Sequence, residues 1–199
     1  MDWERVGRYK PSTAAEGDRE AAVLVPVITR PDDEQLLFTK RADHLGEHPG
    51  QMSFPGGGRE PGDESLEATA RREAFEEIGL EFDAAEIVGR LDDLPTVSNY
   101  SVRPFVAKIP DATYVPDERE VAEIAILSIS DLTDPENYDS ERREHSYYGT
   151  IRIHYFRVDG YTVWGATGRM LAQFLELATD WRIPPEVDRV VDADAEYPV

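Results

Sequence analysis

Apolar residues recur along the chain with the periods of short strands and of helices. Residues 21–29 (AAVLVPVIT) form a continuous apolar run rich in β-branched side chains, which is typical of a buried strand. A turn at residues 31–33 separates this run from residues 35–40, its expected hairpin partner. Residues 167–179 carry apolar side chains at helical spacing and predict a closing amphipathic helix. Further strands are expected at residues 87–91, 102–109, 121–129 and 150–158, and a loop at 41–58.

Helical spacing in residues 58–80 places carboxylates beside an apolar stripe. The segment reads GREPGDESLEATARREAFEEIGL, and its helix is expected to have its N-cap at Asp63 and to stop at Gly79. At about 100° per residue, Glu77 lies inside the stripe and Glu73 about 20° outside its edge. The stripe itself consists of Leu66, Ala70, Ala74 and Ile78.

Carboxylates that face a core are costly when ionised unless they are paired or bind a metal. Here Arg72 alone cannot neutralise Glu73, Glu76 and Glu77, whereas a hard divalent cation with oxygen ligands can. The alternative is a surface helix with a solvated acidic face. The preceding loop at residues 54–58 (FPGGG) argues against it, because glycines allow the backbone to approach a ligand closely. Together the loop and the helix predict a site for a metal and a diphosphate.

Composition limits the class of protein. The 199 residues fit one domain at residues 21–181, between a polar segment at 1–20 and an acidic tail at 182–199 that is expected to be irregular. The chain has no cysteine, which excludes disulfides and thiolate chemistry. No apolar run reaches the length of a membrane span, and the N-terminus lacks the apolar segment of a signal peptide. A cytoplasmic enzyme is therefore expected.

The charge balance is strongly acidic. The chain has 41 Asp and Glu against 21 Lys and Arg, a formal net charge of -20, and lysine occurs only at positions 10, 40 and 108. Such a surplus should repel nucleic acids and anionic membranes, so neither is expected as a partner. It favours adaptation to a salt-rich cytoplasm, where self-repulsion is screened, over an ordinary acidic protein.

The carboxylate segment resembles the Nudix box, and every fixed position of that motif is filled. The matching pattern is Gly58-x5-Glu64-x7-Arg72-Glu73-Ala74-x-Glu76-Glu77-x-Gly79-Leu80. The resemblance implies an α+β fold, an α/β/α sandwich around a mixed β-sheet. It also implies a metal-dependent hydrolase of nucleoside diphosphate linkages, with a small-molecule nucleotide as substrate. The oligomeric state is left open, a homodimer included.

By the same resemblance, Glu73, Glu76 and Glu77 ligate Mg²⁺, with Mn²⁺ as an alternative ion. Arg72 would orient a carboxylate from the second layer of the site, and Glu64 would support the loop. The substrate would meet the backbone of Gly56, Gly57 and Gly58.

The general base is either a glutamate of the box or a carboxylate from a separate loop. We favour Glu120, which precedes a predicted strand, as a further ligand or base, and a solvated loop acid is its alternative. The four histidines lack a paired motif and are expected in loops or on the surface; they are His44, His48, His145 and His154.

A second resemblance concerns the substrate. Residues 37–57 (LFTKRADHLGEHPGQMSFPGG) look like the signature that precedes the box in coenzyme A diphosphatases of the Nudix superfamily. Gly46 stands where that signature has its second arginine, and glycine cannot replace the phosphate-binding geometry of arginine. Arg41 is the best candidate for a phosphate contact, with a structural salt bridge as its alternative. The positions that match are Leu37, Thr39, Arg41, Ala42, Gly50 and 54–57.

This resemblance implies hydrolysis of coenzyme A to adenosine 3′,5′-bisphosphate and 4′-phosphopantetheine. Two other interpretations compete with it. The first is a Nudix hydrolase of ADP-ribose, a dinucleotide or a nucleoside triphosphate, which the missing arginine at Gly46 keeps open. The second is a non-catalytic nucleotide-sensing module, which should have lost carboxylates of the box, and here all are present.

Overall fold

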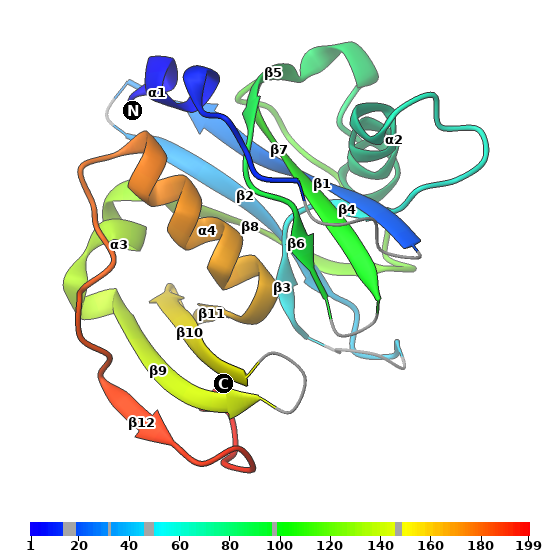
Figure 1. The fold of residues 1–199 in the computed structure, drawn as a ribbon. Helices are drawn as coiled ribbons and strands as arrows, with labels where there is room; N and C mark the ends of the chain where they lie inside the picture. The colour runs from blue at the N-terminus through cyan, green and yellow to red at the C-terminus, as the bar shows by residue number, and fades with distance from the viewer. Residues whose placement is uncertain (14–18, 32, 46–49, 97–98, 146–148) are drawn as a thin grey trace.

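The computed structural model describes residues 1–13, 19–31, 33–45, 50–96, 99–145 and 149–199. Its larger sheet is mixed (Figure 1), because β1 and β7 run parallel while the other neighbours are antiparallel. The strand order is β3-β2-β1-β7-β5, with β4 on β1, β6 on β7 and β8 on β2. The strands are β1 (Arg19–Thr29), β2 (Glu34–Arg41), β3 (Met52–Ser53), β4 (Gly56–Gly58), β5 (Glu86–Arg90), β6 (Leu94–Pro95), β7 (Tyr100–Ile109) and β8 (Val121–Ser128).

A second, smaller sheet lies beyond the helix α4 (Gly165–Ala178) (Figure 1). Its order is β11-β10-β9-β12, and β12 runs parallel to β9. Three of its strands differ from the expectations, since β9 and β11 were not predicted and β12 lies in the tail expected to be irregular. The strands are β9 (Tyr138–His145), β10 (Gly149–Val158), β11 (Tyr161–Val163) and β12 (Arg189–Val191).

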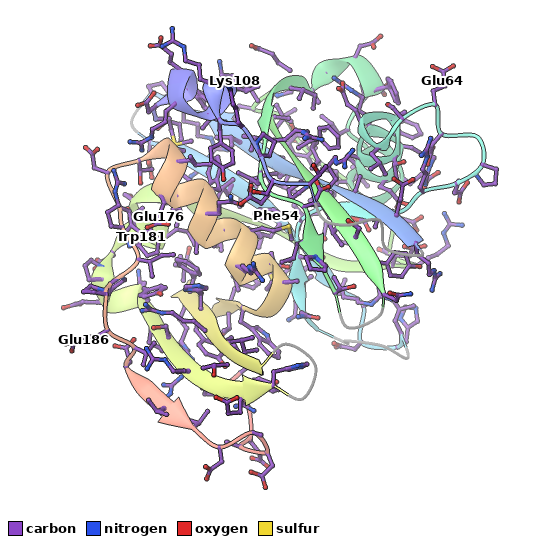
Figure 2. All side chains as sticks on the ribbon, in the orientation of Figure 1. Phe54, Glu64, Lys108, Glu176, Trp181 and Glu186 are labelled. Atoms are coloured by element: carbon purple, nitrogen blue, oxygen red, sulfur yellow. The ribbon has the colours of Figure 1, made fainter. Side chains whose placement is uncertain are left out.

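Two helices cover the larger sheet on opposite faces, which confirms the predicted α/β/α sandwich. The helix α2 (Leu66–Ile78) buries its apolar stripe against one face of β1 and β7. On the other face α4 fills the space between the two sheets, where Phe54 stacks on Phe38 with ring centroids 4.8 Å apart (Figure 2). The remaining helices are short: α1 (Trp3–Arg8), α3 (Ile129–Thr133) and single 3₁₀ turns at Phe82–Ala84 and Pro135–Asn137.

The strands expected from the apolar runs are all present, with ends that differ by at most two residues. The same holds for the closing helix α4. The segment expected to be a loop at 41–58 contains the short strands β3 and β4. Across the described ranges, no helix is both long enough and apolar enough to cross a membrane.

Paired charges explain why β9 was not predicted from the sequence. β9 reads YDSERREH, yet Glu141 and Arg143 are buried and form an ion pair at 2.9 Å. Arg143 also donates to the backbone carbonyl of Ala195, 2.5 Å away, which holds the C-terminal tail on this sheet. Trp181 packs edge-on against Tyr138, with ring centroids 5.2 Å apart. Buried ionic partners thus replace the apolar alternation on which a strand prediction depends.

We expect the protein to become more stable as salt is raised. The net charge of -20 gives a self-repulsion that screening relieves, and the Debye length falls from about 10 Å at 0.1 M to about 3 Å at 1 M. Thermal melts in about 0.1 M and about 2 M KCl measure the effect. A flat or falling Tm would contradict the salt-adapted interpretation and leave the enzymatic one untouched.

Candidate active site

Capping residues set both ends of the carboxylate helix α2. Ser65 is its N-cap, and the Ser65 hydroxyl accepts the backbone N–H of Ala68 at 3.1 Å. The predicted N-cap, Asp63, is therefore wrong by two residues. Gly79 ends the helix in the left-handed region at φ 68°, as expected, because a residue with Cβ is strained there. These ends fix the rotation of the helix and hence the direction of its glutamates.

Asp63 has a different role, which the sequence did not show. Its carboxylate accepts the backbone N–H of Glu60 and the hydroxyl of Thr69, each at 2.9 Å. It also accepts two hydrogen bonds from Arg72, both at 3.0 Å. The Arg72 guanidinium holds the pKa of this carboxyl well below its usual range. Asp63, rather than the exposed Glu64 that Figure 2 labels, ties the loop to α2.

Arg72 connects the loop to two of the predicted metal ligands. Beyond Asp63, it donates to Glu73 at 3.0 Å, to Glu76 at 2.9 Å and to the backbone carbonyl of Gly58 at 3.0 Å. The Asp63 hydrogen bonds, followed by the charge of Glu73, raise the pKa of Arg72. The arginine is thus held in its charged form between the loop and the helix.

Glu77 is a carboxylate of the helix that is largely removed from solvent. Burial, followed by the charge of Glu73, raises its pKa to about 8, and a backbone hydrogen bond from Gly56 opposes this shift. Its Oε2 is buried, and no group in the described part of the chain hydrogen-bonds to it. Burial also raises the pKa of Glu73, although Arg72 opposes the shift. A buried oxygen without a donor is a position where a cation would be favourable.

The Gly-rich strand β4 lies between β1 and the carboxylates. It pairs with β1 in the register Ala22↔Gly57 and Val23↔Gly56. A Cβ on Gly56 would come within 2.4 Å of the Ala22 carbonyl oxygen, and one on Gly57 within 2.5 Å of Oε1 of Glu73. Gly56 is therefore required by the packing of β4 against the backbone of β1, whereas a side chain at Gly57 would displace the Glu73 carboxylate.

A separate loop brings Glu120 to this site. The loop is fastened to the C-terminal end of α2, because Asp117 donates its backbone N–H to the Glu77 carbonyl at 3.0 Å. Glu120 then hydrogen-bonds through its carbonyl to the Ala42 N–H at 2.9 Å. Its charge raises the pKa of both Glu73 and Glu77. The structure thus brings together Glu120 and the helix glutamates, which are distant in sequence.

Arg41 joins the same cluster from β2. The pairing of β2 with β8 shifts register between Lys40 and Arg41, directly beside the Glu120 loop. The positive charge of Arg41 lowers the pKa of Glu77, so the two side chains are close enough to interact. Gly46 and His48 fall outside the described residues.

The three histidines in the described part of the chain lie in different elements of the fold. His44 is exposed and contacts the backbone carbonyl of Arg119 at 3.2 Å, and His145 is half-buried at the end of β9. The expectation of a loop or surface position is wrong for His154, which is buried in β10 and bonds to the Tyr138 hydroxyl at 2.8 Å. Burial lowers the pKa of His154 to about 4, so it stays neutral.

The carboxylates supply the donor set of a hard cation, although their present arrangement is not yet that of a metal site. Within the residues that the structure describes, no three acidic or histidine side chains converge on one point. Arg72 holds both Glu73 and Glu76, and the Glu76 side chain is 53% exposed. An exposed ion pair contributes little stability, so Glu76 can exchange Arg72 for another cation at small cost.

Comparison with known proteins identifies the family. The family profile described as the NUDIX domain matches residues 18–148. The chain belongs to the Nudix family. Two relatives named "Uncharacterized Nudix hydrolase NudL" agree with this assignment. The one from Enterobacter sp. (strain 638) is 37% identical over 83% of this chain and 86% of its own length. The one from Yersinia enterocolitica is 32% identical over 84% of this chain and 85% of its own length.

Structural comparison gives the same fold. The crystal structure of a NUDIX hydrolase from Nitrosomonas europaea has a TM-score of 0.57 and 15% sequence identity, covering 90% of this chain and 81% of that one. This protein is a Nudix hydrolase, an enzyme that acts on pyrophosphate linkages. Nudix hydrolases generally use a divalent metal ion such as Mg²⁺.

Proposed function

We propose that this Nudix hydrolase cleaves the diphosphate of coenzyme A in a reaction that depends on Mg²⁺, with Mn²⁺ as an alternative. The observation that supports the metal site is the buried Oε2 of Glu77, which has no hydrogen-bond partner among the described residues and lies near the charges of Glu73 and Glu120. Glu73 and Glu77 come from the helix and Glu120 from the neighbouring loop, and carboxylate oxygens of this kind are the ligands that a hard cation takes. Glu73, Glu76 and Glu77 would hold the ion.

The bound metal would neutralise phosphate charge and activate a water. Glu120 would act as the general base, accepting a proton from the attacking water as a P–O bond of the diphosphate breaks. Arg72 would position Glu73 and Glu76, to which it is bonded at 3.0 and 2.9 Å. Arg41 would contact a substrate phosphate, because its charge already acts on the site through Glu77. The backbone of Gly56, Gly57 and Gly58 would line the path of the diphosphate.

Coenzyme A is favoured by residues 37–57, which look like the coenzyme A diphosphatase signature. Two residues of this segment support the proposal, because the charge of Arg41 in β2 acts on Glu77 and Gly57 in β4 lies against the Glu73 carboxylate. The screen that tests the proposal compares coenzyme A, ADP-ribose, NADH and dinucleotides, each with Mg²⁺ or Mn²⁺. We expect the highest kcat/KM for coenzyme A. A preference for ADP-ribose or a dinucleotide would refute the coenzyme A proposal and leave the carboxylate chemistry standing.

Gly46→Arg is expected to lower KM for coenzyme A and to leave kcat nearly unchanged. A contact made equally in the ground state and the transition state has this kinetic form. If the missing arginine reads the 3′-phosphate, KM for 3′-dephospho-coenzyme A should change less. Steady-state kinetics of both substrates, with wild type and variant, give the measurement. Equal changes in KM for the two substrates would show that position 46 does not read the 3′-phosphate.

A further inference from the structure

A cleft of about 690 Å³ opens beside Glu73. Its lining includes Gly58 and Asp63 from the site described above, and also Arg19, Tyr100 and Arg59, which have no role in the proposed reaction. The volume lies within the range of about 300–1,000 Å³ typical of small-molecule sites. A ligand in this cleft would reach the carboxylate helix directly, because Glu73 forms part of the lining.

Strand register assembles the aromatic part of the cleft. Arg19 and Tyr100 are Cα partners where the parallel strands β1 and β7 begin. The Arg19 guanidinium lies over the Tyr100 ring, 4.2 Å from its centroid. Tyr100 also reaches across to Gly58, since a Cβ added there would lie 3.7 Å from Cε1 of the ring. An aromatic ring stacked with a guanidinium is a surface on which a nucleobase can stack.

Arg19 and Arg59 supply the positive charge of the cleft. Of its four carboxylates, Glu20, Asp63 and Glu73 have arginine partners, and Glu60 is exposed to solvent. Arg59 pairs with Glu20 at 2.8 Å, and the two side chains are 39% and 47% exposed. Such an exposed pair is weak, so Arg59 is available to a phosphate, which arginine binds with paired hydrogen bonds. Asp63, another carboxylate of the lining, is already neutralised by Arg72 at 3.0 Å.

The geometry points to this cleft as the binding site of the nucleotide half of the substrate. Tyr100 and Arg19 form the platform for the base, and Arg59 binds a phosphate on the ribose side. The inference rests on the proposed diphosphate chemistry at Glu73, which places the reacting phosphates at the inner end of the cleft. The other half of the substrate then extends away from Tyr100.

Calorimetric titration with adenosine 3′,5′-bisphosphate in Mg²⁺ tests the inference without turnover. We expect Tyr100→Leu to raise the Kd roughly tenfold, the effect of losing one stacked base, and Arg59→Gln to weaken binding several-fold. Neither variant should change the binding of 4′-phosphopantetheine. Wild-type protein that does not bind the bisphosphate, or a Tyr100→Leu variant that loses both ligands equally, would overturn the inference.

Two control variants match these changes elsewhere on the surface. Phe82 is a half-exposed aromatic residue with the Arg71 guanidinium 5.6 Å from its ring centroid, so Phe82→Leu removes a similar pair. Arg30 pairs with Asp111 at 2.7 Å with exposures of 39% and 51%, so Arg30→Gln matches Arg59→Gln. Both controls should bind the bisphosphate as the wild type does. Equal weakening in a control and its matched variant would overturn the inference.

Steady-state kinetics separate this inference from the proposed substrate. With whichever nucleotide the enzyme prefers, Tyr100→Leu should raise KM roughly tenfold and leave kcat within about twofold, because the ring binds ground and transition states alike. If that substrate is ADP-ribose and Tyr100→Leu raises its KM as expected, the coenzyme A proposal fails and the cleft assignment stands. If coenzyme A is hydrolysed with unchanged KM by Tyr100→Leu, the cleft assignment fails and the substrate stands.

Discussion

Replacing Glu77 with Gln is expected to lower kcat at least about 100-fold, by analogy with the loss of one group that stabilises a transition state. Gln keeps the size of the side chain and removes its charge, so the variant loses the buried carboxylate whose Oε2 has no donor among the described residues and which would attract a cation. Glu73→Gln should have a similar effect, since the Glu73 carboxylate lies against Gly57 and its charge acts on Glu77. Initial rates at saturating Mg²⁺, together with Mn²⁺ binding followed by electron paramagnetic resonance, measure both effects.

Glu67→Gln provides the matched control for these variants. Glu67 lies on the same helix and pairs with Arg71 at 2.9 Å on its outer side, so the change in net charge is the same. Its kcat and Mn²⁺ affinity should stay close to those of the wild type. Near-normal turnover in Glu77→Gln or Glu73→Gln would reject the assignment of the metal site.

The carboxylate helix could be predicted from sequence because its pattern is local. Ala70, Ala74 and Ile78 are fully buried, and they follow one another at the four-residue spacing of a helix. The same spacing placed Glu77 inside the apolar stripe, and in the structure its Oε2 is buried. The glycine that ends the helix needs only its own backbone conformation, so it too could be predicted.

The contacts that complete the site join different elements of the fold. The helical and strand periodicity of the sequence therefore does not predict them. The Asp63 carboxylate forms an ion pair with Arg72, and Ser65 is the residue that caps the helix. The cleft beside Glu73 depends on the parallel register of Arg19 with Tyr100, separated by most of the first half of the chain. Glu120 was a candidate from sequence, yet its position depends on hydrogen bonds between its loop and the end of α2.

The same Glu77→Gln change that removes activity should stabilise the protein when metal is absent. In the folded chain the pKa of Glu77 is about 8, against an ordinary value of 4.5, chiefly because of burial and then the charge of Glu73. Glu120 adds to this shift and Arg41 opposes it. Between these two pH values the unfolded state has lost a proton that the folded state retains, so raising the pH favours unfolding. Above pH 8 the penalty is constant.

Gln cannot ionise, so the variant escapes this pH-dependent loss. At roughly 1.4 kcal/mol per pKa unit, it should be more stable than wild type by a few kcal/mol at pH 8 and nearly equal at pH 4.5. Thermal melts in EDTA across this range should show a Tm difference that grows to about 5–10 °C. Added Mg²⁺ should raise the Tm of the wild type and not that of the variant, because only an ionised Glu77 gains from the cation. A Tm difference that is independent of pH would contradict the burial of an ionisable Glu77.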